Sequence, residues 1–199
     1  MITKNQIKLI KSLRSKKNRK QSGFFVAEGE KIVDELLESD LEAVNIFSIS
    51  EKYKNLKNYI SINSTQLKQI SNLKSPNNVL GIFKIPANKE IDFNSNIIAL
   101  EEINDPGNLG TIIRLCDWFG IKNIICSENS VDCYNPKVVQ STMGSISRVS
   151  ISYMEFDNLI SSVSHNTVAA DLNGKSLKEH IFSKNQIIFF GNESNGFSQ

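Results

Sequence analysis

The chain has 199 residues, of which 40% are hydrophobic and 22% are charged, and its formal net charge is +2 at pH 7. A chain of this length can bury a sizeable core in one or two domains. No apolar run reaches the roughly 18 residues that a membrane span needs, and the N-terminus has no apolar segment typical of a secretory signal. We therefore expect a cytoplasmic protein with no membrane partner.

The cysteines give no sign of a disulfide framework or a metal site. Cys116, Cys126 and Cys133 are odd in number and have no CxxC spacing, and the chain has only two histidines to accompany them. We expect three reduced thiols and no bound metal.

Positive charge is concentrated at the start of the chain. Residues 1–27 hold eight basic residues and no acidic one, whereas residues 28–199 hold 15 basic and 21 acidic residues. Such a cluster attracts the phosphates of nucleic acid, and the alternative is a solvated basic tail. Apolar residues at helical spacing, Ile7, Ile10 and Leu13, favour a docked helix that holds the charge on a folded surface. We expect RNA contacts from Lys11, Arg14, Lys16, Lys17, Arg19 and Lys20.

The first half of the chain alternates helices and strands, as expected for a small α/β domain. Helices are expected at about 3–14, 30–39 and 64–73, and strands at 24–29, 44–50, 59–63 and 78–86. The segment 86–96 is polar and contains Pro and Asn, so a domain boundary is expected there.

The second half repeats a strand and helix pattern that predicts a parallel sheet. Strands are expected at 96–102, 123–126, 148–152, 167–172 and 186–190, and helices at 110–120, 135–144 and 156–163. Two of these strands run into turns rich in Gly and Asn, one near residue 102 and one near residue 191. The ends of buried strands are the usual place for a ligand site in an open α/β sheet.

The first of these loops reads EEINDPGNLGTIIR. Pro106 and Gly107 predict a turn, and Asn108 is expected to cap a helix that starts near residue 109 or 110. Helical spacing predicts a buried stripe on that helix and directs Gly110 and Arg114 away from it. The predicted stripe consists of Ile112, Leu115, Cys116 and Phe119. A surface ion pair between Arg114 and Asp117 is the alternative interpretation of the arginine.

The second loop, GNESNGFSQ, follows the strand QIIFF. Its glycines permit close backbone approach to a ligand, and Glu193 places a carboxylate at the end of the strand. An ordinary turn is the alternative. The loop contains neither GxGxxG nor GK[ST], which argues against an unrelated nucleotide-binding enzyme.

Together, the two loops resemble the first two signatures of the SpoU/TrmH-type ribose 2′-O-methyltransferases of the SPOUT superfamily. Positions that match the first signature are Asn108, Gly110 and Arg114. Positions that match the second are Gly191, Asn192, Glu193 and Gly196. The intervening segment KVVQSTMGSISRV matches at Ser141, Gly144 and Ser145, and QSGFFVAEGEKIVDELL is similar to the opening of the family's L30e-like RNA-binding domain.

The resemblance implies an α/β protein with an L30e-like substrate-binding domain in 1–87, a linker in 88–96 and a mostly parallel-sheet SPOUT (α/β knot) domain in 97–199. The implied activity is methyl transfer from S-adenosylmethionine to a ribose 2′-hydroxyl in RNA, with ribosomal RNA favoured over transfer RNA. A homodimer is the implied assembly.

The resemblance also assigns roles to the signature residues. Arg114, Asn108 and Glu193 are the implied catalytic group, in which Asn108 and Glu193 hold Arg114 and the ribose. Arg114 orients the hydroxyl or a phosphate in preference to acting as a base, because a guanidinium stays protonated and its planar fork suits a phosphate. The implied cofactor-binding residues are Gly191, Asn192, Glu193 and Gly196, and the implied RNA contacts include Arg114 and Ser141.

One signature of the family has no counterpart. The third signature is a Leu/Asn/Ser-rich loop before the last helix, and the sequence ends at Gln199. We therefore expect a truncated domain, in which the knot and the cofactor pocket are incomplete and the dimer is weakened. Two hypotheses follow: a methyltransferase that is active in full-length form, and a noncatalytic RNA-binding protein.

Overall fold

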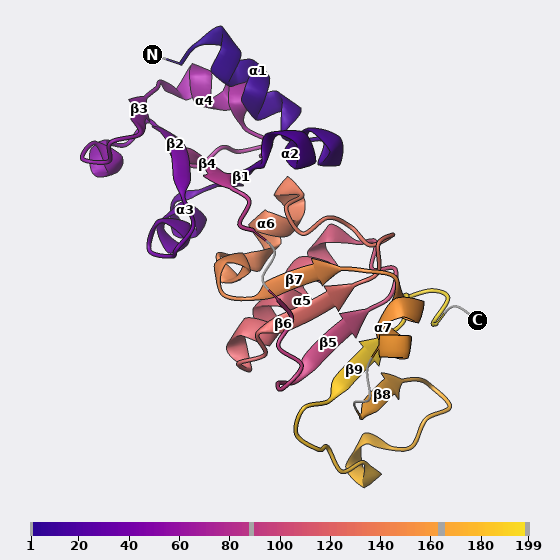
Figure 1. Cartoon of the computed structure of the whole chain (residues 1–199). Coiled ribbons are helices and arrows are strands. Elements are labelled where there is room, and N and C mark those ends of the chain that lie inside the picture. The colour runs from indigo at the N-terminus through magenta and orange to yellow at the C-terminus, as the bar shows by residue number, and fades with distance from the viewer. Residues whose placement is uncertain (1, 88–89, 163–165, 198–199) are drawn as a thin grey trace. The chain divides into compact units, whose positions relative to one another are not determined.

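The computed structural model describes residues 2–87, 90–162 and 166–197 (Figure 1). The chain forms two compact units. One holds the residues up to Ala87 together with Asp132–Ser147, and the other holds the described residues from Glu90 to Val131 and from Arg148 to Phe197. The predicted domain limits, 1–87 and 97–199, stay a prediction, but the packing departs from them in the segment 132–147. Residues 88–89 of the predicted linker lie outside the described residues.

The first unit is built on a four-stranded mixed sheet with the strand order β1-β4-β2-β3. Strand β4 is antiparallel to β1 and β2, and β2 is parallel to β3. The elements are α1 (Lys4–Ser12), α2 (Lys16–Ser22), β1 (Phe24–Glu28), α3 (Glu30–Leu37), β2 (Ala43–Ser48), η1 (Glu51–Tyr53), β3 (Tyr59–Ser61), α4 (Ser64–Ile70), β4 (Val79–Lys84), α6 (Pro136–Thr142) and η2 (Ser145–Ser147).

Helices α1 and α4 lie side by side against this sheet (Figure 1). Ile10 of α1 and Leu13, which caps its C-terminus, are fully buried in a cluster with β1 and β4, which confirms the predicted docking of an amphipathic helix. Phe25 points to the other face of β1, and its ring packs against Tyr134 with 4.8 Å between the ring centroids. The segment 132–147 therefore shares the core of the first unit.

The start of the chain differs from the prediction of one helix over 3–14 followed directly by a strand. Helix α1 ends at Ser12, and a second helix, α2, runs from Lys16 to Ser22 and is closed by Gly23 in a left-handed conformation with φ of 72°. The sequence of α2 is KKNRKQS, which contains no apolar side chain. Because hydrophobic periodicity is the main signal of a helix in a sequence, α2 gave none.

The second unit is built on a five-stranded sheet with the order β7-β6-β5-β9-β8, in which every paired strand is parallel. The parallel sheet predicted from the sequence is therefore confirmed. Its elements are β5 (Ile97–Leu100), α5 (Pro106–Trp118), β6 (Asn123–Cys126), β7 (Ser150–Tyr153), α7 (Phe156–Ser162), β8 (Thr167–Ala170), η3 (Leu177–Glu179) and β9 (Ile187–Phe190). The last residue of the helix predicted at 156–163 lies outside the described residues.

Helices cover both faces of this sheet (Figure 1). Helix α7 packs against one face through Leu159, next to Ile97 and Ala99 of β5. Helix α5 buries Leu109, Ile113 and Cys116. No helix among the described residues is long and apolar enough to cross a membrane.

The predicted buried stripe of α5 is wrong except for Cys116. Ile112 is half-buried, and Leu115 and Phe119 are 50% and 73% exposed. Helix α5 carries apolar residues on more than one side, so periodicity alone does not tell which side faces the sheet. The three cysteines are buried and form no disulfide, and burial raises the pKa of the Cys116 thiol to about 11.

A side chain at position 144 would both collide with a neighbouring residue and strain the backbone. Its φ is 99°, and a Cβ there would lie 2.6 Å from the Cβ of Glu35 on α3. We expect Gly144→Ala to lower the free energy of unfolding by about 2 to 4 kcal/mol. Gly23→Ala is the matched control, because φ is 72° there and nothing lies within 4 Å. That control should cost about 1 kcal/mol in a urea titration, and equal losses for the two variants would rule out the collision with Glu35.

Candidate functional site

The two signature loops lie at the same edge of the parallel sheet. They follow β5 and β9, which are adjacent and parallel, so that Leu100 is the register partner of Phe190. The strand order also reverses here, because β6 and β7 extend from one side of β5 whereas β9 and β8 extend from the other (Figure 1). Such a switch point is where open α/β sheets bind their ligands.

The helix of the first loop starts earlier than predicted. Helix α5 begins at Pro106, and Asp105 is its N-cap, with Oδ1 accepting a hydrogen bond of 2.8 Å from the backbone N–H of Asn108. The prediction of Asn108 as the cap is therefore wrong. Asp is a preferred cap and Pro a preferred first residue of a helix. Asn108 stands in the first turn, where its side chain is directed to another partner.

That partner is Glu193 of the second loop. Asn108 Nδ2 donates to Glu193 Oε1 at 2.9 Å, across 85 residues of sequence. A second hydrogen bond joins the same loops, from Asn192 Nδ2 to the carbonyl oxygen of Glu102, also at 2.9 Å. The structure thus joins the two loops through Asn108 with Glu193 and through Asn192 with the carbonyl of Glu102.

Glu102 is a residue of the site that the sequence analysis did not single out. Its backbone is left-handed, with φ of 47°, which is uncommon for a residue other than Gly, Asn or Asp. Its N–H donates to Ser127 Oγ at 2.8 Å, and its carbonyl accepts from Asn192. These bonds hold the strained turn between β5 and α5. The sequence did not indicate the role of Glu102, because Glu has no preference for the left-handed conformation.

The second loop is shaped by Asn192 and two glycines. Asn192 Oδ1 accepts from the N–H groups of Ser194 and Asn195 at 2.9 and 3.0 Å, and the backbones of Asn192 and Gly196 form a reciprocal antiparallel bridge. A Cβ on Gly191 would lie 2.5 Å from the carbonyl carbon of Gly196. Only glycine therefore fits at position 191 while the loop folds back on itself.

A hollow of about 280 Å³ lies between the two loops. Its volume is near the lower end of small-molecule sites. The lining combines apolar side chains with two carboxylates and contains no Lys or Arg. The lining residues are Leu100, Glu101, Ile103, Asn108, Thr111, Ile112, Phe190, Gly191 and Glu193. Such a lining suits a ligand with an apolar body and a positive charge.

Arg114 is exposed on α5 and does not line this hollow. Within the described part of the chain it has no hydrogen bond or ion pair. Its alternative partner, Asp117, accepts instead from Arg148 Nε at 2.8 Å, so the interpretation of Arg114 as half of a surface pair with Asp117 is wrong. The side chain of Arg114 makes no hydrogen bond with Asn108 or Glu193, which bond to each other.

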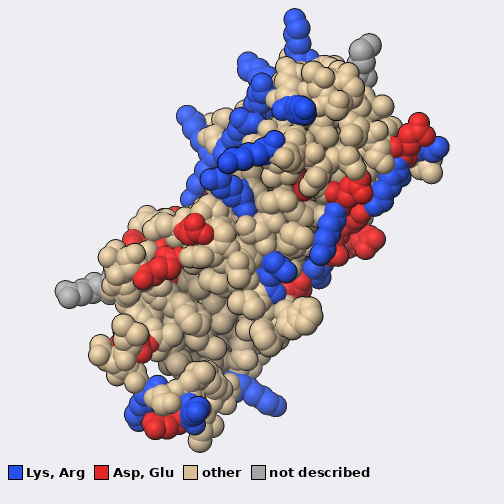
Figure 2. Space-filling model, turned by 180° about the vertical axis from the view of Figure 1, so that it is seen from behind, with Lys and Arg blue, Asp and Glu red and all other residues tan. Residues whose placement is uncertain are grey.

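The basic residues of the first unit form an exposed face on α1 and α2, where Lys and Arg gather in Figure 2. Its seven exposed residues, which we call the basic face, are Lys4, Lys8, Lys11, Arg14, Lys16, Lys17 and Lys20. Arg19 was predicted to contact RNA but does not belong to this face. It is 2% exposed and forms an ion pair with Asp132. Ser141 is half-buried on α6, and its hydroxyl donates to the carbonyl of Lys137 at 2.9 Å.

No group of three or more His, Cys, Asp or Glu side chains that could hold a metal ion occurs among the residues that the structure describes. The fold and the site define a class of α/β protein in which a basic module precedes a parallel-sheet domain with a ligand site at its switch point.

Sequence comparisons identify the family. Residues 95–199 match the SpoU rRNA methylase family, and residues 4–81 match an MRM3-like substrate binding domain. The chain belongs to the SpoU rRNA methylase family. It is 26% identical to the 23S rRNA guanosine 2′-O-methyltransferase of Bacillus subtilis over 148 residues, which are 71% of this chain and 59% of that protein.

Solved structures agree with this assignment. A TrmH-family protein from Porphyromonas gingivalis is 30% identical with a TM-score of 0.90, and the match covers all of this chain and 84% of that one. The AdoMet-bound rRNA methyltransferase from Sinorhizobium meliloti is 26% identical with a TM-score of 0.83, over all of this chain and 82% of that one. The match spans 40% of the length of the rRNA methyltransferase 3 of Xenopus tropicalis and 59% of the Bacillus subtilis protein.

The close approach at Gly191 gives a test of the second loop. We expect Gly191→Ala to separate the backbones of residues 191 and 196, because a backbone carbon cannot yield as a flexible side chain does. Hydrogen exchange should then show lost protection of the Asn192 and Gly196 amides, with little change in the strands of the sheet.

The matched control is Gly196→Ala, which carries backbone strain but has nothing within 4 Å of its Cβ. It should keep more of the protection at Asn192. Full protection in the Gly191 variant would show that the loop accommodates a side chain at that position.

Proposed function

We propose that this chain is part of an S-adenosylmethionine-dependent methyltransferase that acts on a ribose 2′-hydroxyl in RNA. The observation that carries the proposal is the meeting of the two signature loops, through Asn108, Glu193, Asn192 and Glu102, at the switch point of the parallel sheet. Family membership and the 2′-O-methyltransferase named in Bacillus subtilis support the same chemistry.

The hollow between the loops fits part of S-adenosylmethionine, whose sulfonium supplies an electrophilic methyl group when it is bound. Leu100, Ile112 and Phe190 offer apolar surface, and Glu101 and Glu193 offer carboxylates toward a positive charge. Gly191 lines the hollow next to these groups. The AdoMet-bound relative from Sinorhizobium meliloti supports this use of the site.

Arg114 is proposed to orient the acceptor ribose or its phosphate. A guanidinium remains protonated in proteins, so it donates hydrogen bonds and does not accept a proton. Its planar fork matches two phosphate oxygens. The exposed position on α5, where Asp117 is occupied by Arg148, supports a partner from outside the chain.

The proposed substrate is ribosomal RNA, with transfer RNA as the alternative. The rRNA methyltransferases among the relatives support the first choice. The basic face of α1 and α2 supports binding through phosphates, which is sequence-independent and falls with salt. We also propose a cytoplasmic location, in agreement with three free thiols.

We propose a homodimer, because an exposed apolar patch usually marks an interface. Helix α5 exposes Leu115, Trp118 and Phe119, of which Trp118 is 85% and Phe119 is 73% exposed. Apolar surface of this kind on a helix that also carries Arg114 favours a partner surface over solvent.

The catalytic assignment predicts a split between binding and turnover. Arg114→Ala should lower methyl transfer to RNA by at least about 100-fold while calorimetry gives an unchanged affinity for S-adenosylmethionine, because Arg114 does not line the hollow. Arg114→Lys should restore little, since Lys has no planar fork. An equal loss of cofactor affinity and turnover would contradict an orienting role.

The second candidate function is a noncatalytic RNA-binding protein, which the small volume of the hollow favours. The same calorimetry separates the two. Binding of S-adenosylmethionine by the wild-type chain, lost in Gly191→Ala, supports the methyltransferase. No binding together with retained RNA affinity would support the noncatalytic protein.

The basic face predicts a change in salt dependence. Lys4, Lys8 and Lys11 replaced together by Gln should flatten the slope of log affinity against log salt by about 2 to 3, since each lost phosphate contact removes just under one unit. Replacing these lysines is preferable to deleting the N-terminal helices, because Ile10 and Leu13 belong to the core.

The control replaces three exposed lysines of the second unit, Lys175, Lys178 and Lys184, by Gln. It changes the net charge equally and should leave the slope nearly unchanged. Similar slopes for the two triple variants would contradict the assignment of RNA binding to α1 and α2. Titration with ribosomal and transfer RNA distinguishes the two substrates.

A further inference from the structure

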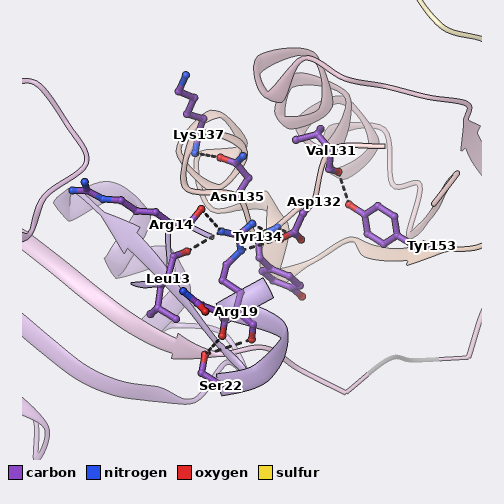
Figure 3. A network of polar contacts seen from close by, with 11 residues as sticks. Leu13, Arg14, Arg19, Ser22, Val131, Asp132, Tyr134, Asn135, Lys137 and Tyr153 are labelled. Atoms are coloured by element: carbon purple, nitrogen blue, oxygen red, sulfur yellow. Dashed lines mark hydrogen bonds and ion pairs between the residues drawn. The ribbon is translucent and has the colours of Figure 1, made fainter. Parts of the chain in front are cut away.

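Arg19 lies at the centre of a buried polar network in the first unit (Figure 3). Its Nε donates to Asp132 Oδ2 at 2.9 Å, and its Nη2 donates to the same oxygen. Its Nη1 donates to the carbonyl oxygens of Leu13 and Arg14 at 2.8 and 2.9 Å. One side chain thus joins α2, the end of α1 and a residue 113 positions later in the sequence.

Helix α2 depends on this side chain for its attachment. It has seven residues and no apolar side chain, and Arg19 is its one buried residue. Its N-cap, Ser15, makes no side-chain capping hydrogen bond. A helix this short is not stable alone in water. Two further hydrogen bonds attach α2: Asn18 Nδ2 donates to the carbonyl of Ser12 at 3.0 Å, and the carbonyl of Gly23, the C-cap, accepts from the N–H of Ile85 at 2.7 Å.

Asp132, by contrast, is held in place independently of α2. Its Oδ1 accepts from the N–H of Tyr134 at 3.1 Å, and the Tyr134 ring packs against Phe25. Just beyond, Asn135 caps α6, which buries Val138 and Val139. Asp132 is therefore a fixed anion at the start of a packed segment, and Arg19 brings α2 to it.

We propose that Arg19 is a positioning residue with Asp132 as its anchor, and that the pair orders α2 so that Lys16, Lys17 and Lys20 bind RNA phosphates as one surface. This inference rests on the proposed RNA binding by the basic face. It makes the RNA affinity of the N-terminal helices depend on an acidic residue from the part of the chain that matches the methyltransferase family, residues 95–199.

The proposal predicts the opposite sign from simple electrostatics. Removing a negative charge near a basic surface strengthens the attraction for phosphates when the structure is unchanged. Asp132→Asn should instead weaken binding, because α2 loses its anchor and an uncompensated charge remains on buried Arg19. Ordering three lysines is worth more to RNA binding than removing one partly screened anion.

The experiment uses the whole chain and a fluorescein-labelled RNA hairpin as probe, titrated at several salt concentrations. Asp132→Asn is expected to lower the affinity about tenfold at low salt and to flatten the salt slope by about 2 to 3 units. Lys16, Lys17 and Lys20 replaced together by Gln should give the same loss. Adding Asp132→Asn to that triple variant should cause little further loss, because both act on the same contacts.

The matched control is Glu51→Gln, which makes the same charge change at a residue of the same unit whose side chain is 83% exposed. Its affinity should be unchanged or slightly higher. Asp132→Glu keeps the charge and should recover part of the lost affinity.

Hydrogen exchange supplies a readout that does not use RNA. In Asp132→Asn the amides of Arg19 and Gly23, which are bonded within the α2 turn, should lose protection while the amides of β4 keep theirs. The double variant Arg19→Met with Asp132→Leu removes both charges and so avoids an unpaired buried ion. It should keep the fold of the unit, show the same loss of protection in α2 and bind RNA as weakly as Asp132→Asn.

Three outcomes would overturn the proposal. Unchanged or higher RNA affinity in Asp132→Asn would show that the pair does not order α2 for RNA binding, but it would not contradict RNA binding by the basic face. Loss of protection spread evenly over the whole first unit would show that the pair belongs to the general core. If the Lys16, Lys17 and Lys20 variant binds RNA normally, these lysines make no contact, and the fault lies with the proposed RNA face on α2.

Discussion

The parallel pairing of β5 with β9 is the constraint on which the candidate site depends. These strands lie almost 90 residues apart in the sequence, and their register places Leu100 beside Phe190 at the edge where both loops begin. Because the loops leave from adjacent strands, Asn108 reaches Glu193 and Asn192 reaches the carbonyl of Glu102. Each loop alone resembles an ordinary turn. Because β5 pairs with β9, the two loops lie together and line one hollow.

Much of this arrangement follows from local sequence, and the failures have identifiable causes. Strand and helix periods predicted the parallel sheet, and strand ends rich in Gly and Asn predicted the loops. The cap of α5 was misplaced because Asp105 and Asn108 are both good capping residues, and Pro106 decides between them only if it is taken as the first residue of the helix. The buried side of α5 was misjudged because the helix is apolar on more than one side.

Charge misled the sequence analysis in a different way. Arg19 stands among exposed lysines and was grouped with them, yet it is the member of that cluster that is buried. Its partner Asp132 is remote in sequence, so no local pattern indicates the pair. Arg114 shows the converse: a nearby Asp117 suggested a surface pair, but Arg148 occupies that carboxylate. Pairing of charges is decided by tertiary structure, and single-sequence spacing reports only the nearest candidates.

Residues 132–147 come from the second half of the sequence but pack in the first unit, which gives Gly144 a further meaning. Gly144 lies between the two signatures in the sequence, yet the atoms that crowd it belong to Glu35 of α3. Helix α2 presents the reverse situation, since Arg19 is its one buried residue and its sequence holds no apolar side chain. Apart from Arg19, the residues of α2 can therefore change with little effect on the core, whereas a side chain at position 144 would collide with Glu35. Over evolutionary time, we expect the composition of α2 to vary more freely than the residues around Gly144.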